Sequence, residues 1–239
     1  MTWSIIARDP ATGQVGIAVA TRFFAVGALV PHVETDVGAV ASQAFVNPFY
    51  GRQGLAMLRD GASADAVVAA LTGPDAGRTQ RQVHVMDRAG RFAAYTGEAC
   101  VDWCGHAIHD GFSVAGNMLA GPAVIAQTAR AFASAQGPLA LRFLAAMRAG
   151  EAAGGDKRGR QSAAMLVHDG EAYPLLDIRV DDHPDPLAEL ARLEAVSRER
   201  FAHYRPLMPS RANPAGVTDR AEIDRRIAAG IAATRPAQS

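Results

Sequence analysis

The apolar positions of the chain change their period several times along the sequence, and each change predicts a new element. Residues 3–8 and 15–21 are rich in β-branched and aromatic side chains and flank the turn-forming run Asp9-Pro10-Ala11-Thr12-Gly13, so they predict a hairpin. Residues 82–96 and 162–180 predict two further hairpins, around Asp87-Arg88-Ala89-Gly90 and around Asp169-Gly170. Apolar runs predict additional strands at 27–33, 37–45 and 112–116.

Helical spacing of apolar residues appears in the remaining segments. Residues 52–59 form one predicted helix, and Ser63 is a suitable N-cap for the next. A third helix follows Gly121-Pro122, and a fourth runs from Pro138 to Gly150. Asp185-Pro186 begins a helix with leucines at 187, 190 and 193 on one stripe.

This order of elements predicts an α+β fold. Hairpins outnumber β-α-β units, so the sheets should be mostly antiparallel. Each sheet has to bury both of its faces, which favours a four-layer αββα sandwich of two sheets between two helical layers. We expect this domain to span residues 1–205. A Pro- and Asn-rich linker and a charged tail helix would then occupy 206–239.

Composition and charge narrow the possible partners. The chain has 24 Lys and Arg against 24 Asp and Glu, so it offers no net attraction to nucleic acid or to an anionic membrane. No apolar run approaches the roughly 20 residues that span a bilayer, and the N-terminus does not resemble a signal peptide. Cys100 and Cys104 are too few for a disulfide framework. We therefore expect a cytoplasmic protein that binds neither nucleic acid nor membrane.

The second residue offers the most specific chemistry. Thr2 has a small side chain, so the initiator Met1 is expected to be removed. Thr2 would then carry a hydroxyl nucleophile and a free α-amine, whose unperturbed pKa of roughly 7.7–8.0 suits a general base. Alternatively, Thr2 is simply an exposed chain end.

A family resemblance supports the chemical interpretation. The segment from Thr2 to Asn47, with Thr21-Arg22 and the strand Gly38 to Ala44, resembles the opening of N-terminal nucleophile hydrolases of the proteasome-subunit type. Residues 2–193 more closely resemble the bacterial family DUF1028, a domain of unknown function. The motifs that carry this resemblance are TRFFAVGALVP, SQAFVNPFYG, GNMLAGP, GGDKRGRQSAA and RVDDHPDPLAEL. The resemblance implies a cofactor-independent amidohydrolase that forms an acyl-enzyme on Thr2, and a homodimer or higher homo-oligomer.

Three further residues are expected to take part in catalysis, Arg22 and Asn117 because of their positions at predicted strand ends and Ser162 because the resemblance implies it. Arg22 would keep the α-amine neutral and stabilise the oxyanion, although it could instead pair with a structural carboxylate. Asn117 would donate to the oxyanion, although Asn is also a good helix-entry residue. Ser162 would orient the terminal amine.

Three further residues are expected to bind the substrate. Gln43 and Asn47 lie on and after the strand whose backbone N–H, from Gln43 or Ala44, would serve as an oxyanion donor. Asp156 belongs to the polar loop before Ser162. Asn47-Pro48 could be only a turn, and the loop only a solvated connection. These polar side chains suggest a small polar amide substrate with a carboxylate.

Two other functions remain open. The fold could serve a non-catalytic protein that binds small metabolites. A metal-dependent hydrolase could use Cys104, His106 and His109, which lie near Cys100. The four side chains are too close in sequence for the usual paired-ligand spacing, so we expect no metal. Without a dinucleotide-binding, P-loop or Gly-x-Ser-x-Gly motif we also expect no nucleotide cofactor and no serine-esterase elbow.

Overall fold

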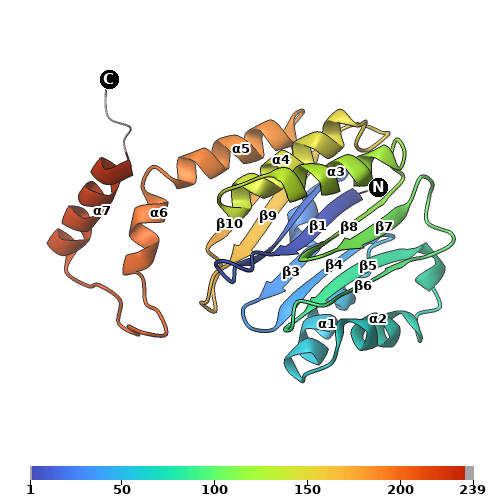
Figure 1. The fold of residues 1–239 in the computed structure, drawn as a ribbon, viewed down its shortest axis with the longest axis horizontal. Helices are drawn as coiled ribbons and strands as arrows, with labels where there is room; N and C mark the ends of the chain where they lie inside the picture. Colours follow the sequence, from blue (N-terminus) through green and yellow to red (C-terminus); the bar gives the residue numbers. More distant parts are fainter. Residues whose placement is uncertain (1, 235–239) are drawn as a thin grey trace. The chain divides into compact units, whose positions relative to one another are not determined.

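Two antiparallel sheets form the centre of the first of two units in the chain. The computed structural model describes residues 2–234, and the chain divides into Met1–Leu190 and Ala191–Ser239. In the first unit a six-stranded sheet has the order β10-β9-β2-β1-β8-β7, and a four-stranded sheet the order β3-β4-β5-β6 (Figure 1). The strands of the first sheet are β1 (Thr2–Arg8), β2 (Val15–Thr21), β7 (Gly105–His109), β8 (Phe112–Asn117), β9 (Ser162–His168) and β10 (Leu176–Val180). Those of the second are β3 (Pro31–Glu34), β4 (Gly38–Ala44), β5 (Arg81–Asp87) and β6 (Phe92–Thr96).

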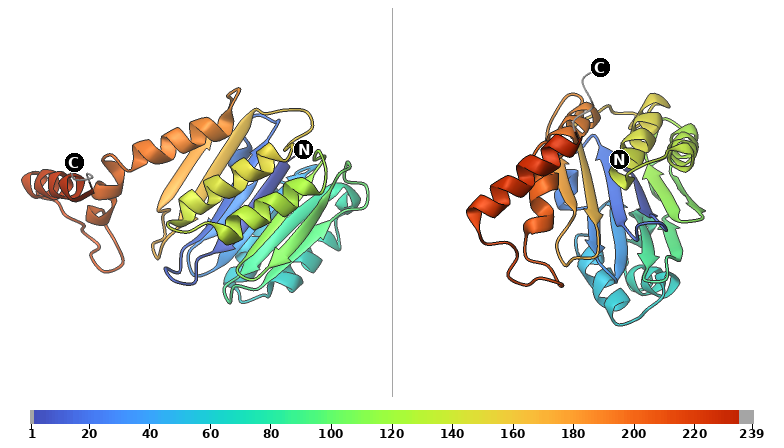
Figure 2. Two further views of the ribbon diagram at one scale, coloured as in Figure 1. Left: turned by 45° about the horizontal axis from the view of Figure 1, so that its top comes forward. Right: turned by 60° about the vertical axis from the view of Figure 1, so that its left-hand side comes forward.

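A layer of helices covers the outer face of each sheet. Helices α3 (Ala123–Ser134) and α4 (Leu139–Ala152) lie over the six-stranded sheet. Helices α1 (Phe49–Arg59) and α2 (Ala64–Thr72) lie over the four-stranded sheet, on the opposite side (Figure 2). The predicted four-layer αββα sandwich of antiparallel sheets is confirmed.

Successive side chains of a strand point to opposite faces of its sheet, so each sheet packs against the other sheet on one face and against helices on the other. On β1, Ile6 packs in an apolar core between the two sheets, together with Ile17 and Val19 of β2. The neighbouring Trp3 faces the helices and lies beside Gly150 of α4, where a Cβ would come within 2.9 Å of the indole nitrogen.

Separate clusters fill the spaces beneath the two helical layers. Phe112 of β8, Phe132 of α3 and Phe143 of α4 pack against one another, with ring centroids 4.9 and 5.6 Å apart. Val40, Tyr50 and other side chains pack between α1, α2 and the four-stranded sheet.

Two elements differ from the prediction. The apolar run at 27–33 contains a 3₁₀ turn, η1 (Val26–Ala28), before β3 begins at Pro31. This turn lets Val26 and Val30 both reach the core between the sheets. Strand β7 was not predicted, because it is a largely exposed edge strand and lacks an apolar run.

The second unit contains the short helix α6 (Phe201–Tyr204), a 3₁₀ turn, η3 (Arg205–Leu207), and α7 (Arg220–Thr234). Helix α5 (Pro186–Ser197) spans the division between the units. An Arg200–Asp224 ion pair of 3.3 Å joins the start of α6 to α7. The expected domain boundary near residue 205 stays a prediction. No helix within residues 2–234 is long and apolar enough to cross a membrane.

Candidate active site

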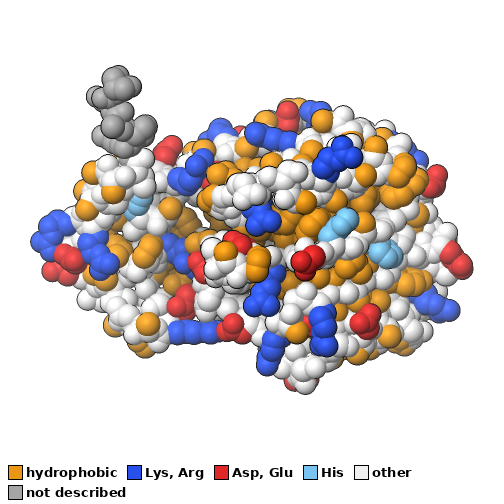
Figure 3. Space-filling model, in the orientation of Figure 1, with side chains coloured by type: hydrophobic (Ala, Val, Ile, Leu, Met, Phe, Trp, Pro, Cys, Tyr) orange, Lys and Arg blue, Asp and Glu red, His pale blue; other side chains and the backbone are white. Residues whose placement is uncertain are grey.

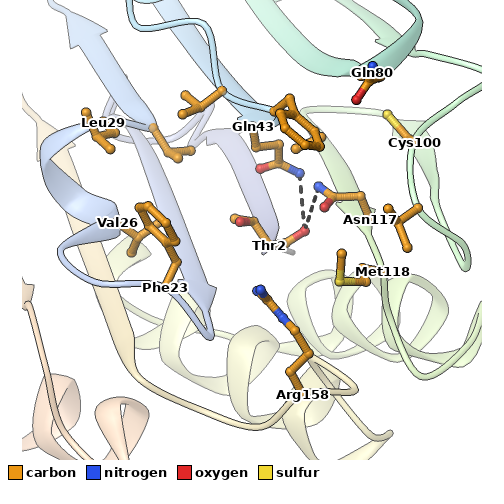
Figure 4. Close-up of a pocket in the computed structure, with 15 residues that line it drawn as sticks. Thr2, Phe23, Val26, Leu29, Gln43, Gln80, Cys100, Asn117, Met118 and Arg158 are labelled. Atoms are coloured by element: carbon orange, nitrogen blue, oxygen red, sulfur yellow. Dashed lines mark hydrogen bonds between the residues drawn. The ribbon is translucent and has the colours of Figure 1, made fainter.

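A cavity of about 400 Å³ opens where the first residue of β1 faces the four-stranded sheet. Its wall is built by the start of β1, the β2–β3 connection, the end of β4, the loop between β6 and β7, the end of β8 and the loop before β9 (Figure 4). The lining residues are Thr2, Phe23, Val26, Leu29, Val30, Gln43, Ala44, Phe45, Val46, Gln80, Cys100, Val101, Asn117, Met118 and Arg158.

Thr2 lies on the floor of this cavity. It is the first residue of β1, opposite Asn117 of β8, and is only 6% exposed. Strand alternation turns its side chain toward the other sheet, on the same face as Ser4 and Ile6. The Thr2 hydroxyl donates to Thr21 Oγ1 at 3.1 Å. Thr2 is therefore a buried cavity residue and not an exposed chain end.

Two carboxamides hold the backbone of Thr2. Asn117 Nδ2 and Gln43 Nε2 donate to the Thr2 carbonyl at 3.3 and 3.5 Å (Figure 4). The same nitrogens donate to Gln82 Oε1, at 3.0 Å from Asn117 and 2.8 Å from Gln43. An amide nitrogen has two protons, so these contacts use all the donors of both side chains. In this geometry both amides are directed at the Thr2 carbonyl and at Gln82, and Asn117 contacts the Thr2 backbone.

Gln82 fixes the direction of these hydrogen bonds. Its Nε2 lies within hydrogen-bond distance of three acceptors, which are the carbonyls of Gly105 and Gly116 at 3.0 and 2.9 Å and Thr96 Oγ1 at 2.8 Å. Because backbone carbonyls only accept, the nitrogen of Gln82 must face them and its oxygen must face Gln43 and Asn117. The orientation of all three amides follows from two glycine carbonyls.

The network continues deeper between the sheets. Ser4 Oγ donates to Gln43 Oε1 at 2.6 Å, which uses its single proton. His84 Nε2 must then donate to Ser4 Oγ at 2.9 Å, and His84 Nδ1 accepts from Ser113 Oγ at 2.7 Å. Burial is the main cause that lowers the pKa of His84 to about 3, so the ring is neutral at physiological pH.

An acid–base pair on the loop before β9 places a cation at the cavity. Asp156 is buried and accepts from the backbone N–H of Arg22 at 2.7 Å and of Arg158 at 2.8 Å. The Arg158 guanidinium donates to the same carboxylate at 3.3 Å and points toward Thr2 (Figure 4). Asp156 thus orients Arg158, and it does not itself line the cavity.

The guanidinium that lies at the cavity belongs to Arg158 and not to Arg22. The Arg22 guanidinium is exposed and donates to the carbonyl of Arg160 at 3.2 Å, away from the cavity lining. Among the described lining residues, Arg158 is the one Lys or Arg. The sequence identified the charged loop that contains Arg158, but it does not reveal which arginine of the loop points inward.

Two other predicted residues support the wall without lining it. Ser162 Oγ donates to the Phe23 carbonyl at 2.5 Å and accepts from Val26 N–H at 3.2 Å, so it fixes the β2–β3 connection. Asn47 Oδ1 accepts from Phe49 N–H at 3.0 Å, which forms a turn at the start of α1. The turn interpretation of Asn47 is the one that this contact favours.

Two of the four described non-glycine residues with a positive φ line the cavity. Ala44 and Met118 adopt φ values of +70° and +56° at the ends of β4 and β8. The left-handed region costs a residue with a Cβ on the order of 1–3 kcal/mol, and such strain is commonly found at functional sites.

The cysteines and histidines near the site do not form a metal centre. Among residues 2–234, no three His, Cys, Asp or Glu side chains come together in a way that could hold a metal ion. His106 Nδ1 lies 2.9 Å from Thr96 Oγ1, and His109 stacks on Phe112 at 4.7 Å. Burial is the main cause that raises the pKa of the Cys100 thiol to about 11, so this lining residue is not a thiolate at neutral pH.

A second groove lies outside the sandwich, between β7 and α3. Apolar side chains and histidines gather there (Figure 3). It is lined by His106 and His109, two of the candidate metal ligands, but by none of the predicted catalytic or substrate-binding residues.

The cavity lining is mainly apolar, whereas the sequence suggests a small polar amide substrate. Most of the lining side chains are apolar, and Arg158 is already paired with Asp156. The amide nitrogens of Gln43 and Asn117 donate to Thr2 and Gln82 within the protein.

Comparison with known proteins identifies relatives of the whole first unit. The family of unknown function DUF1028 matches residues 2–190 and confirms the predicted family. A crystal structure of a Silicibacter pomeroyi protein of this family is 35% identical, with a TM-score of 0.85, over 91% of this chain and 96% of that chain. The ancestral β-subunit Anbu of Yersinia bercovieri matches 82% of this chain and 94% of that chain, at 9% identity and a TM-score of 0.38, which is too low to carry an argument. No curated protein matches this chain.

Proposed function

The chain belongs to DUF1028, a family of unknown function, and from the geometry of its site we propose that it is an N-terminal-threonine amidohydrolase. The observation that carries the proposal is the position of Thr2. Its hydroxyl lies on the floor of a cavity, its carbonyl is held by two carboxamides, and a guanidinium points toward it (Figure 4).

The reaction requires removal of Met1, which leaves the α-amine of Thr2 free. Thr2 Oγ attacks the carbonyl carbon of the substrate amide, and its proton passes to the α-amine, directly or through water. The C–N bond then breaks, and the leaving nitrogen takes that proton. Water attacks the resulting ester and gives a proton to the same amine. The ester C–O bond breaks, Oγ recovers its proton, and a carboxylic acid is released.

Arg158 supplies the positive charge that this chemistry needs. A cation near the α-amine lowers the pKa of the amine and favours its neutral, basic form. The same charge stabilises the oxyanion of the tetrahedral intermediate. The backbone N–H of Ala44, at the strained end of β4, is our candidate for a second oxyanion donor.

The remaining polar residues position Thr2 and Arg158. Gln43 and Asn117 hold the Thr2 backbone, and Asp156 orients Arg158. Ser162 fixes the connection that carries Phe23 and Val26. Their expected contribution is to the rate of acylation, since an error of about 1 Å in a reacting group can reduce the rate about a hundredfold.

Mass spectrometry tests the proposal. Intact mass shows whether the purified protein lacks Met1, and incubation with a library of amides should give an acyl adduct that peptide mapping locates on Thr2. Thr2→Ala should abolish both the adduct and hydrolysis, while Thr2→Ser should retain them. Retained Met1, or hydrolysis that is unchanged in Thr2→Ala, would contradict the mechanism. Reversible binding without turnover would support the non-catalytic alternative.

A further inference from the structure

The cavity beside Thr2 has two apolar walls. Phe23, Val26, Leu29 and Val30 come from the β2–β3 connection, and Phe45, Val46, Val101 and Met118 come from three other segments. A volume of about 400 Å³ lies within the range of about 300–1,000 Å³ that is typical of pockets for small organic ligands.

The apolar walls continue onto the rim of the cavity. Phe23 is 54% exposed, Phe45 63% and Val101 44%. Single exposed apolar residues are ordinary, but a group of them around a concave opening is typical of a ligand-binding groove. In Figure 4, Phe23 and Val26 lie on one side of Thr2 and Met118 on the other.

Apart from the side chain of Gln80, the polar groups that line the cavity lie at its reacting end. The donors of Gln43 and Asn117 are used on Thr2 and Gln82, and the Arg158 charge is close to Thr2. Substrate atoms beyond the scissile bond would therefore meet mainly carbon. A polar acyl group would lose its water there without gaining hydrogen bonds.

We propose that the substrate is an amide with an apolar acyl group, a linear or branched alkyl chain or an aryl group, which lies between these two walls during acylation. This inference rests on the proposed function, because it names the substrate class of the same site. The acyl group remains bound as the ester on Thr2, and the amine leaves through the open mouth.

A series of α-alkyl β-lactones tests the substrate class separately from the amide reaction. Thr2 Oγ attacks the lactone carbonyl, the acyl C–O bond of the ring breaks, and the ring oxygen leaves as an alcohol with the proton of the nucleophile. The rate of the mass increase is measured on the Met1-free protein for alkyl chains from methyl to decyl, with the adduct mapped to Thr2.

We expect the rate constant to rise about fourfold per added methylene, equivalent to about 0.8 kcal/mol, until the cavity is filled. If none of the chain lengths gives an adduct, the proposed function is overturned and the inference with it. An adduct whose rate is independent of chain length, or falls with it, would overturn the inference alone.

A matched pair of variants distinguishes binding of the alkyl chain inside the cavity from general hydrophobic attraction to the protein surface. Leu29→Trp narrows one wall and should reduce the rate more strongly as the chain lengthens, by tenfold or more for decyl. Ile108→Trp, on the exposed strand β7 outside the cavity, should leave the length dependence unchanged. Val46→Trp narrows the other wall and replaces Leu29→Trp if circular dichroism shows that the latter is unfolded. A length dependence that neither wall variant alters would overturn the inference.

Discussion

Gln82→Met is the sharpest test of the buried network, because methionine has nearly the shape of glutamine but no amide. Gln82 is fully buried, so water cannot readily replace what the substitution removes. The two protons of the Gln82 amide, which the carbonyls of Gly105 and Gly116 share with Thr96 Oγ1, are lost, and the amide nitrogens of Gln43 and Asn117 each lose an acceptor, so about four hydrogen bonds disappear. At about 1 kcal/mol or more for each buried polar group left without its partner, the variant should lose about 4 kcal/mol of unfolding free energy.

This loss is a large part of the roughly 5–15 kcal/mol that stabilises a typical domain. Urea unfolding should show a lower midpoint with an unchanged slope, and lactone acylation of Thr2 should slow at least tenfold because its two holding amides are no longer oriented. Gln161→Met is the matched control, since that amide makes a solvent-exposed contact with Asp182, and its stability should change by less than about 0.5 kcal/mol. A loss below about 1 kcal/mol in Gln82→Met, with normal acylation, would refute the network that we derive.

Three further predictions concern single side chains around the site. The pKa of His84 is about 3 in the folded protein and about 6.5 in the unfolded chain. Between these pH values His84 binds a proton only when the chain is unfolded, so the free energy of unfolding should fall as pH drops from about 6.5 toward 3. His84 should contribute up to about 1.4 kcal/mol per pH unit to the slope in urea unfolding, and His84→Gln should reduce the slope by that amount; equal slopes would contradict a neutral buried ring. Ser162→Ala removes two contacts to the β2–β3 connection and should speed hydrogen exchange at residues 23–26, whereas unchanged protection would show that Ser162 does not hold this segment. Arg158→Met should slow acylation by about a hundredfold and Arg22→Met by less than about threefold; the reverse order would return the cationic role to Arg22.

The sequence predicted the fold well because most elements have a clear hydrophobic period. The hairpin of β1 and β2 and the helix from Pro138 both appear where the pattern places them. The apolar run at 27–33 was misassigned as one strand because a 3₁₀ turn and a strand can bury the same valines. A short apolar run does not distinguish these conformations.

The site was predicted less completely, because a sequence places a residue on an element but does not orient its side chain. Thr2, Gln43 and Asn117 do line the cavity, while Arg22 and Ser162 point elsewhere.

The buried glutamine and histidine of β5 were missed as well. Gln82 and His84 alternate with valines in QVHVM. On a strand that is covered on both faces, polar residues at alternate positions face one neighbouring layer together, and this pattern is the signal that could have revealed them.

The two carbonyls that orient Gln82 belong to Gly105 and Gly116, which are paired across β7 and β8. Strand β7 is the outermost strand of its sheet and has a largely exposed surface, so it has the features of a region that tolerates sequence variation. Through Gly105, its backbone nevertheless supplies one of the two carbonyls that orient three amides beneath Thr2. Substitutions that shift the backbone of this edge strand by a fraction of a hydrogen-bond length should therefore slow the reaction at Thr2, although no altered side chain touches the cavity.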